Sequence, residues 1–393
     1  MTATPPAPRA HACVIGSMDL VRPLGLAGIR CAAVLARDDV AARSRFTQTV
    51  IPLADPRREP ELLLERLMSY AEAQPEPPVL FYGQDVDLLF VSRHRDRLNE
   101  AFRFVIADAP LVEELVDKAR FGELARRLGL PVPSSVRIDA GEVSPSDLPL
   151  TFPLVVKPVA RGRGNWAAVA DGAKALQAAT PGELGAIWPR LAGERLEVMV
   201  QEMIPGPETR VESYHVYVDQ AGEVAAEFTG RKIRTYPSAY GETTALEITA
   251  AHDVAKLGRE LVRRIGLQGV AKFDFKRDAA GRLHLLEVNP RFNLWHHPGA
   301  RAGANLPALV YADLTGSARP RPQAVRPGVR WVYHAHDARA ARLQGMPLRR
   351  WVPWAMSAEA KSVVALDDPM PMVMGALVRL GGRLRVGPRA GSA

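Results

Sequence analysis

The stretch LLEVNPRF, residues 285–292, has the composition of a strand that is buried on one side only. Side chains two residues apart on a strand point to the same face, so Glu287 and Asn289 are expected to share a face. Pro290 ends the strand, and Arg291 adds a permanent positive charge beside it. An acid, an amide and an arginine at the end of an apolar strand indicate a site that handles charged groups.

The longer segment VAKFDFKRDAAGRLHLLEVNPRF, residues 270–292, pairs this strand with the one before it. DAAG, residues 278–281, predicts a hairpin turn with glycine in the last position. A four-residue loop keeps the pairing in even register, and Asp274 then faces the same side as Glu287 and Asn289. Two carboxylates and an amide oxygen are hard ligands that suit Mg²⁺ held together with nucleotide phosphates. The opposite face is expected to form the core, through Phe273, Phe275, Leu286 and Val288.

A different interpretation of the hairpin is that its polar face is the solvated side of an amphipathic sheet. Lys272 and Lys276, which flank the acid of FDFK, fit that alternative. His296 and His297 lie nearby in the sequence, but adjacent residues rarely bind one metal together, so a structural role is expected for them. The hairpin alone leaves both interpretations open.

Two lysines stand where an ordinary surface lysine would be unfavourable. Lys118 lies in the first turn of a predicted helix, where it opposes the helix dipole unless an anion is bound there. Lys157 lies inside an apolar run, where an unpaired charge is costly. The loop that follows, with Gly162 and Gly164, matches G-x-G-x-x-A, yet it fits a hairpin that covers phosphates better than a dinucleotide fingerprint or a P-loop. The alternative for Lys118 is a plain surface residue.

Two further strands carry polar residues at positions that could face a ligand. EVMVQEMIPGPE, residues 197–208, predicts a strand followed by a Pro-Gly-Pro turn. EFTGRKIRTYP, residues 227–237, predicts a strand with basic residues on one face, and its alternative is a solvated strand face. The polar residues are Gln201, Glu202 and Glu208 in the first stretch, and Lys232, Arg234 and Tyr236 in the second.

Residues 11–110 alternate short apolar runs with helical stretches, which predicts β-α-β units and a parallel sheet of Rossmann-like type. Ligands of such sheets bind beyond the carboxyl ends of the strands. An equally good interpretation of each polar or glycine residue at a strand end is that it only forms a turn. The strand-end residues are Gly16, Ser17, Gly83, Gln84 and Asp85.

The composition excludes several classes of protein. The 393 residues suffice for two or three domains, and 47% hydrophobic with 24% charged residues is typical of globular proteins. The net charge is +8, but no basic block, zinc-finger or RNP-like motif accompanies it, so nucleic-acid binding is not expected. Two cysteines, Cys13 and Cys31, exclude a disulfide scaffold and favour the cytoplasm. Without a signal-peptide pattern or an apolar run of about 18 residues, neither secretion nor membrane insertion is expected.

The ordered set of motifs resembles the ATP-grasp superfamily, the fold of D-alanine–D-alanine ligase, biotin carboxylase and the carbamoyl-phosphate synthase large subunit. The resemblance rests on Lys118, Lys157, the glycine loop, VQEMIPGPE, FDFK and LLEVNPR. It implies an α/β and α+β architecture and points to the carboxylate–amine ligase branch. The implied parts are a Rossmann-like pre-ATP-grasp domain (1–110), an ATP-grasp domain (111–316) with a lid at about 150–205, and a linker with a small C-terminal extension (317–393).

The resemblance also implies a role for each candidate residue. Contact with ATP phosphates is implied for Lys118, Lys157, Gly162 and Gly164. Contact with adenine is implied for Gln201, Glu202, Met203 and Ile204, and contact with ribose for Glu208. Ligation of Mg²⁺ is implied for Asp274, Glu287 and Asn289. The catalytic candidates beside the transferred phosphate or the substrate are Arg291, Lys232 and Arg234.

The implied reaction joins a small-molecule carboxylate to an amine through an acyl phosphate, with release of ADP and phosphate. ATP and Mg²⁺ are the implied cofactors, with Mn²⁺ as an alternative metal, and a homodimer is an expectation from relatives. An ATP-grasp carboxylase or kinase is the nearest alternative. A nicotinamide-dependent oxidoreductase is less favoured, because it leaves the acidic hairpin unexplained.

Overall fold

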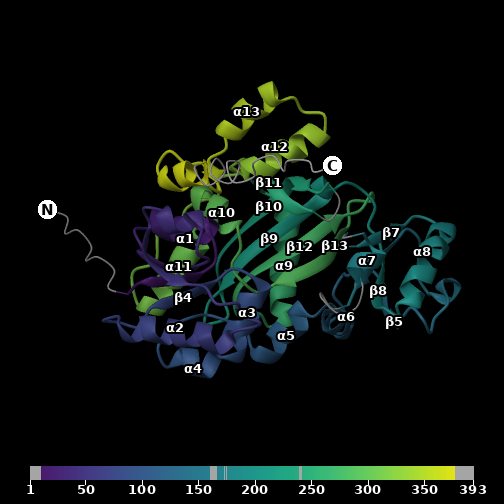
Figure 1. Ribbon diagram of the computed structural model, residues 1–393, viewed down its shortest axis with the longest axis horizontal. Coiled ribbons are helices and arrows are strands. Elements are labelled where there is room, and N and C mark those ends of the chain that lie inside the picture. Colours follow the sequence, from purple (N-terminus) through teal and green to yellow (C-terminus); the bar gives the residue numbers. More distant parts are fainter. Residues whose placement is uncertain (1–9, 160–165, 172, 174, 239–240, 377–393) are drawn as a thin grey trace, which may run out of the picture.

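A computed structural model describes residues 10–159, 166–171, 173, 175–238 and 241–376. Three sheets organise them: a four-stranded parallel sheet, a seven-stranded mixed sheet and a four-stranded antiparallel sheet. Figure 1 shows the parallel sheet at the left, the large sheet in the middle and the small sheet projecting at the right. The large sheet therefore stands between the other two.

The N-terminal sheet has the strand order β3-β2-β1-β4 with every pair parallel, which confirms the Rossmann-like prediction. β1 lies between β2 and β4, so the direction in which the sheet grows reverses there. Gly16 and Gly83 follow β1 and β4, and a Cβ on Gly83 would lie 3.6 Å from the Gly16 Cα. The elements are β1 (Ala12–Ile15), α1 (Met18–Leu26), β2 (Cys31–Leu35), η1 (Val40–Arg43), β3 (Thr47–Pro52), α2 (Pro60–Glu72), β4 (Val79–Tyr82), α3 (Asp85–Arg93) and α4 (Arg95–Asn99).

Two helices lead from this domain to the rest of the chain. The helices are α5 (Ala109–Val116) and α6 (Lys118–Arg127). The Asp117 carboxylate caps α6 by accepting from the backbone N–H groups of Ala119 at 2.9 Å and Arg120 at 3.0 Å. Gly129, with a φ of +60°, takes the left-handed conformation that follows the helix end. The cap therefore fixes Lys118 in the first turn of α6.

The small antiparallel sheet, of order β5-β8-β6-β7, forms a lid with a core of its own. The buried side chains of Val156, Leu184 and Val198 belong to that core. β5 pairs with β8, so we assign β5 to the lid, which then begins before residue 150. The elements are β5 (Ser135–Asp139), η2 (Pro145–Asp147), β6 (Leu154–Pro158), α7 (Trp166–Val169), β7 (Leu176–Ala178), α8 (Pro181–Gly193) and β8 (Glu197–Glu202).

The large sheet has the order β13-β12-β9-β10-β11-β14-β15, and only β14 and β15 pair in parallel. α9 packs on β9 and β10 at close range, because a Cβ on Gly258 would lie 2.3 Å from Tyr214 Cδ1. The elements are η3 (Glu208–Arg210), β9 (Val211–Val218), β10 (Val224–Tyr236), β11 (Glu242–Thr249), α9 (His252–Ile265), β12 (Gly269–Arg277), β13 (Leu283–Asn289), α10 (His296–Ala302) and α11 (Leu306–Thr315).

Two segments of the predicted C-terminal extension, residues 330–332 and 360–361, are strands of the large sheet. β14 pairs with β11, and β15 pairs with β14. No helix within the described ranges is long and apolar enough to cross a bilayer. The elements are β14 (Arg330–Val332), α12 (His334–Leu343), α13 (Leu348–Met356) and β15 (Ala360–Lys361).

A buried carboxylate ties α12 to the sheet. Asp337 accepts hydrogen bonds from Arg234 Nε at 2.8 Å and Arg234 Nη2 at 2.7 Å. It also accepts from Thr244 Oγ1 at 2.9 Å and Trp351 Nε1 at 2.8 Å. The Arg234 guanidinium stacks over the Trp354 ring, 4.0 Å from its centroid. A charge pair with this many partners fixes the position of β10 against the C-terminal helices.

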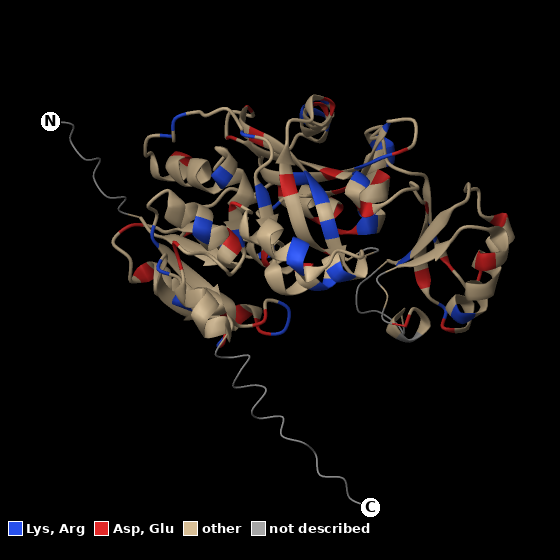
Figure 2. Ribbon diagram, turned by 90° about the horizontal axis from the view of Figure 1, so that it is seen from above, with Lys and Arg blue, Asp and Glu red and all other residues tan. Residues whose placement is uncertain are grey.

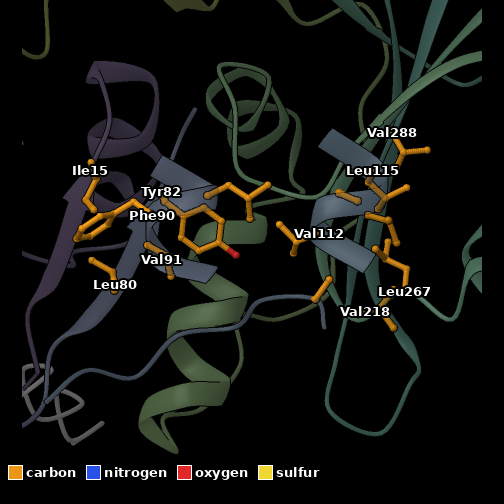
Figure 3. Packing of buried hydrophobic residues seen from close by; sticks show 14 of the residues in the cluster. Ile15, Leu80, Tyr82, Phe90, Val91, Val112, Leu115, Val218, Leu267 and Val288 are labelled. Atoms are coloured by element: carbon orange, nitrogen blue, oxygen red, sulfur yellow. The ribbon is translucent and has the colours of Figure 1, made fainter. Parts of the chain in front are cut away.

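One hydrophobic core joins the parallel sheet to the large sheet. Because α5 lies between the two sheets, its apolar side chains contact both, and the N-terminal domain is held against the strands that carry the hairpin. Figure 3 shows this core, from Ile15, Leu80, Tyr82, Phe90 and Val91 through Val112 and Leu115 to Val218, Leu267 and Val288.

We predict that Asp337→Ala lowers the free energy of unfolding by about 3–5 kcal/mol, because the Arg234 guanidinium is left buried without its partner. Urea denaturation followed by circular dichroism measures the change. Arg339→Ala, at an exposed position on the same helix, is the matched control and shifts the free energy by about 0.5 kcal/mol or less. Equal stability of the two variants would show that the buried pair does not hold the C-terminal helices.

Candidate active site

A cavity of about 600 Å³ lies between the lid and the large sheet, with Lys118 of α6 at its edge. This size suits a ligand as large as a nucleotide. Figure 2 shows basic and acidic segments close together on the central strands. Predicted residues that line the cavity are Lys118, Lys157, Gln201, Glu202, Met203, Ile204, Glu208, Lys232, Asp274 and Glu287. The predicted Gly162 and Gly164 lie outside the described residues.

β9, β12 and β13 place polar side chains in two neighbouring rows across the sheet. The central residues of the rows, Asp274 and Lys272, are two positions apart on β12, so the rows share one face. The first row consists of Ser213, Asp274 and Glu287, and the second of His215, Lys272 and Asn289. The predicted grouping of two acids and an amide is thus present, with a lysine between them.

The register of the hairpin differs from the one expected. Asp274 pairs with Glu287, but Phe275 pairs with Leu285, so Leu286 is an extra residue in a β-bulge. The prediction that Leu286 belongs to the core is wrong: Leu285 is fully buried, and Leu286 lines the cavity. Beyond a bulge, the side chains of the strand point to the opposite face. No turn residue in the sequence indicates that a bulge occurs here.

Asp274 is a buried carboxylate whose charge is balanced by a neighbouring cation. Lys272 Nζ lies 2.5 Å from one carboxylate oxygen, and the Ser213 hydroxyl donates to the other. Burial raises the pKa of Asp274, but the positive charges of Lys272 and Lys232 lower it by more, so the pKa is about 2. Lys272 and Ser213 were missed as site residues. The available signal was the alternation of β12, which puts Lys272 on the face of Asp274.

Glu287 and Asn289 complete a set of oxygen donors. Asn289 Nδ2 donates to Glu287 Oε1 at 3.1 Å, so the two side chains meet above β13. Carboxylate and amide oxygens fit Mg²⁺ better than a metal that prefers His or Cys. The site has two carboxylates and one amide, and no group of three or more His, Cys, Asp or Glu side chains that could hold a metal occurs among the described residues. The donor set therefore fits the cation that the sequence implied.

Lys157 enters the cavity from the lid and faces the acids of the large sheet. Its Nζ donates to Gln201 Oε1 at 2.9 Å. Burial lowers the pKa of Lys157, and the negative charges of Glu287 and Glu208 raise it in part. Lys118 reaches the same cavity from α6. Two lysines from separate elements thus converge on one space, as a polyanionic ligand requires.

The segment that follows β8 forms the hinge between the lid and the large sheet. The Glu202 carboxylate accepts from the backbone N–H of Thr151 at 2.9 Å. The backbone N–H of Met203 donates to the Pro153 carbonyl at 2.8 Å. The Glu202 side chain thus supports the lid, while Met203 and Ile204 border the cavity.

The structure separates the two basic residues of β10 that were expected on one face. Lys232 lines the cavity, with its Nζ 3.8 Å from Glu208 Oε2. The pairing of β10 with β11 shifts on both sides of Arg234, which breaks the regular alternation. Arg234 is buried against Asp337 and does not line this cavity. Its charge is paired with Asp337 of α12, so the geometry does not support a catalytic role for Arg234.

Arg291 lies where the hairpin meets the N-terminal domain. Its Nε donates to Asp85 Oδ1 at 2.5 Å, and its Nη1 donates to the Gly83 carbonyl at 3.0 Å. Its Nη2 donates to Asn289 Oδ1 at 3.2 Å. Arg291 is not among the described residues that line the cavity, and it adjoins them through Asn289. The sequence indicated Gly83 and Asp85 only as strand ends, and their contact with Arg291 spans more than 200 positions.

Comparison with known proteins shows what this architecture is similar to. A family described as "ATP-grasp in the biosynthetic pathway with Ter operon" matches residues 194–336. The fold matches the ADP complex of purK, N5-carboxyaminoimidazole ribonucleotide synthetase (TM-score 0.61, 14% identity, 83% of this chain and 82% of that one). It also matches L-amino acid ligase from Bacillus licheniformis (TM-score 0.61, 16% identity, 82% and 78%). The family match therefore covers the strands that carry the acids of the cavity, and the likeness to the solved structures extends to the fold of most of the chain.

The curated proteins similar to this chain include two kinds of ligase. The D-aspartate ligase of Enterococcus faecium (strain Aus0004) is 25% identical over 284 residues, covering 70% of this chain and 65% of the relative. A D-alanine–D-alanine ligase of Ectopseudomonas mendocina (strain ymp) is 29% identical over 225 residues, covering 52% and 66%. The chain thus spans slightly less than two thirds of the length of these relatives.

We predict that Lys157→Met weakens ADP binding by about 10- to 100-fold, because the nucleotide loses a charge-assisted contact in a partly desolvated cavity. Isothermal titration calorimetry measures the affinity. Lys256→Met, at an exposed position on α9, leaves the affinity unchanged. An affinity for ADP that is equal in the two variants would remove Lys157 from the nucleotide site.

Proposed function

We propose that the chain is an ATP-dependent ligase that joins a small carboxylate to a small amine. The observation that carries this proposal is the meeting of opposite charges across one cavity. Asp274 and Glu287 of the hairpin line this cavity together with Lys118 of α6 and Lys157 of the lid. A triphosphate bridged by a divalent cation matches such a cavity. The similarity to a D-aspartate ligase and to D-alanine–D-alanine ligases supports a carboxylate and an amine as substrates.

In the proposed nucleotide complex, the base lies at the hinge and the phosphates lie between the two lysines. The hinge offers main-chain groups next to a cavity wall, which is the usual way to recognise a purine edge. The carboxylate of η3, just before β9, also lines the cavity and suits the ribose hydroxyls. The proposed contacts are Gln201, Glu202, Met203 and Ile204 for the base, Glu208 for the ribose, and Lys118 and Lys157 for the phosphates.

Asp274, Glu287 and Asn289 are the residues proposed to hold Mg²⁺, with Mn²⁺ as the alternative. Asp274 is ionised at neutral pH because its pKa is about 2, so it offers a carboxylate without losing a proton. When bound, the cation would neutralise phosphate charge and polarise the transferred phosphoryl group. Lys272 shares the Asp274 carboxylate, so it brings a further positive charge to the same place.

The proposed chemistry has two steps. In the first, a carboxylate oxygen of the substrate bonds to the γ-phosphorus of ATP, and ADP leaves with the bridging oxygen. In the second, the amine nitrogen bonds to the acyl carbon, phosphate leaves with the electron pair of the carbon–oxygen bond, and the amine gives up a proton. The first step brings two anionic groups together, and the second develops negative charge on the acyl oxygen and the leaving phosphate, so both need fixed positive charges. Lys157, Lys232 and Arg291 are the side chains placed to supply them.

The nearest alternatives share the nucleotide site and differ in what receives the phosphate. An ATP-grasp carboxylase or kinase would use the same lysines and acids. The solved biotin carboxylase from Campylobacter jejuni matches the fold at 15% identity, which bears on the fold alone. We place the reaction in the cytoplasm, where ATP is available and where the free Cys13 and Cys31 stay reduced.

The test measures ADP release with pairs of amino acids and small carboxylic acids, together with the masses of the products. We expect ADP release that requires both partners and a product heavier by the amine less one water. Release with one partner alone, with a phosphorylated or carboxylated product, would replace the ligase with a kinase or a carboxylase.

We predict that Glu287→Ala abolishes the amine-dependent ADP release and leaves the fold intact, because the metal site loses one of its two carboxylates. Circular dichroism and the release assay measure the two effects. Glu223→Ala, at an exposed turn, serves as the control and turns over normally. Release near the unmodified rate in Glu287→Ala would contradict the metal assignment.

A further inference from the structure

We propose that Asp85, in the N-terminal domain, is a positioning residue that holds Arg291 in the orientation needed for catalysis. This inference rests on the proposed function, in which Arg291 adjoins the transferred phosphate and the acyl group. It gives the N-terminal domain a direct part in the chemistry of a site that otherwise lies between the lid and the large sheet.

The contacts of Arg291 show how its guanidinium is fixed. Asp85 receives the Nε hydrogen at 2.5 Å, and the Gly83 carbonyl receives one from Nη1 at 3.0 Å. The N-terminal domain thus holds two nitrogens of the planar group, and Asn289 Oδ1 accepts from the third, Nη2, at 3.2 Å. A guanidinium held at three nitrogens cannot rotate about its long side chain. Nη1 also donates to the Phe292 carbonyl at 3.3 Å, so both of its hydrogens are used. The second hydrogen of Nη2 is therefore the one that can be donated to a substrate.

Asp85 stands on a rigid support. It is the first residue of α3, and the loop before it is fixed by a capping box in which Asp87 Oδ2 accepts from the Gln84 backbone N–H at 3.0 Å. The helix itself is anchored by Phe90 and Val91, which belong to the core that joins the two sheets (Figure 3). A carboxylate so placed sets the position of its partner to within the precision that a catalytic group requires.

A purely structural ion pair between domains is the competing explanation, and exposure argues against it. The Asp85 side chain is 40% exposed and the Arg291 side chain is 17% exposed. Pairs that are open to solvent contribute little to stability, while the large apolar core already joins the two sheets. The pair therefore adds more to the orientation of Arg291 than to the stability of the fold.

The experiment compares Asp85→Asn, Arg291→Met and the double variant in the amine-dependent release assay. We expect Asp85→Asn to lower kcat by about 10- to 100-fold with the KM for ATP unchanged, because a misplaced group costs rate rather than nucleotide binding. In the Arg291→Met background, Asp85→Asn should have no further effect, since its action passes through Arg291. Asp96→Asn, at an exposed position on α4, is the control that changes neither constant.

A second measurement uses inorganic phosphate as the probe and needs no knowledge of the substrates. Phosphate binding to the protein loaded with Mg²⁺ and ADP is followed by calorimetry in the same variants. We expect Asp85→Asn and Arg291→Met to weaken it to a similar degree, with unchanged affinity for ADP and unfolding midpoints equal to that of Asp96→Asn. Rate or phosphate-binding losses that add in the double variant, or an Asp85→Asn protein equal to the unmodified one, would overturn the proposal.

The two measurements separate the failure of this inference from the failure of the proposed function. If no acid and amine pair releases ADP, the ligase proposal fails, while the phosphate titrations still report on the link between Asp85 and Arg291. If release occurs and the two sites act independently, the ligase proposal stands and the positioning role of Asp85 is wrong.

Discussion

A carboxylate buried under an open cavity has to have its charge balanced, and this requirement organises the large sheet. Asp274 meets it with Lys272 on its own strand and with the Ser213 hydroxyl on the next strand. Removing one partner of such a pair would leave an uncompensated buried charge, which costs about 3–5 kcal/mol. The register of β9, β12 and β13 is therefore constrained electrostatically as well as by backbone pairing. That register sets the two rows on which the candidate active site is built.

The other parts of the chain act by bringing further charges to these rows. The lid supplies Lys157, α6 supplies Lys118, and the N-terminal domain supplies the carboxylate that holds Arg291. Local contacts fix the positions of these side chains, as the Asp117 cap of α6 does for Lys118. The core around α5 then fixes the N-terminal domain against the sheet. The cavity lined by α6, the lid and the large sheet thus carries charges of both signs.

Local patterns in the sequence were enough to predict the features that depend on neighbours along the chain. The alternation of apolar and polar residues gave the parallel sheet and the face shared by Asp274 and Glu287, and the cap and glycine of α6 placed Lys118. Features that depend on partners far away in the sequence were not predicted. The bulge at Leu286 arises between paired strands, and the Asp337 partner of Arg234 lies more than 100 positions away. The pairing of β14 with β11 and of β15 with β14 was not predicted for the same reason.

The fate of the two cations on β10 shows why site assignments from a strand pattern need the tertiary structure. Lys232 and Arg234 are two residues apart, and a regular strand would have offered both to the same ligand. The irregular pairing of β10 with β11 turns Arg234 to the C-terminal helices, where Asp337 and Trp354 engage it, and leaves Lys232 in the cavity opposite Glu208. Arg234 thereby holds the C-terminal helices in place, and Lys232 lines the cavity. The bulge in the hairpin does the converse, since it moves Leu286 from the core to the cavity wall without disturbing the acids beside it. Irregular strand pairing, and not composition, therefore decides which side chains of this sheet face the cavity.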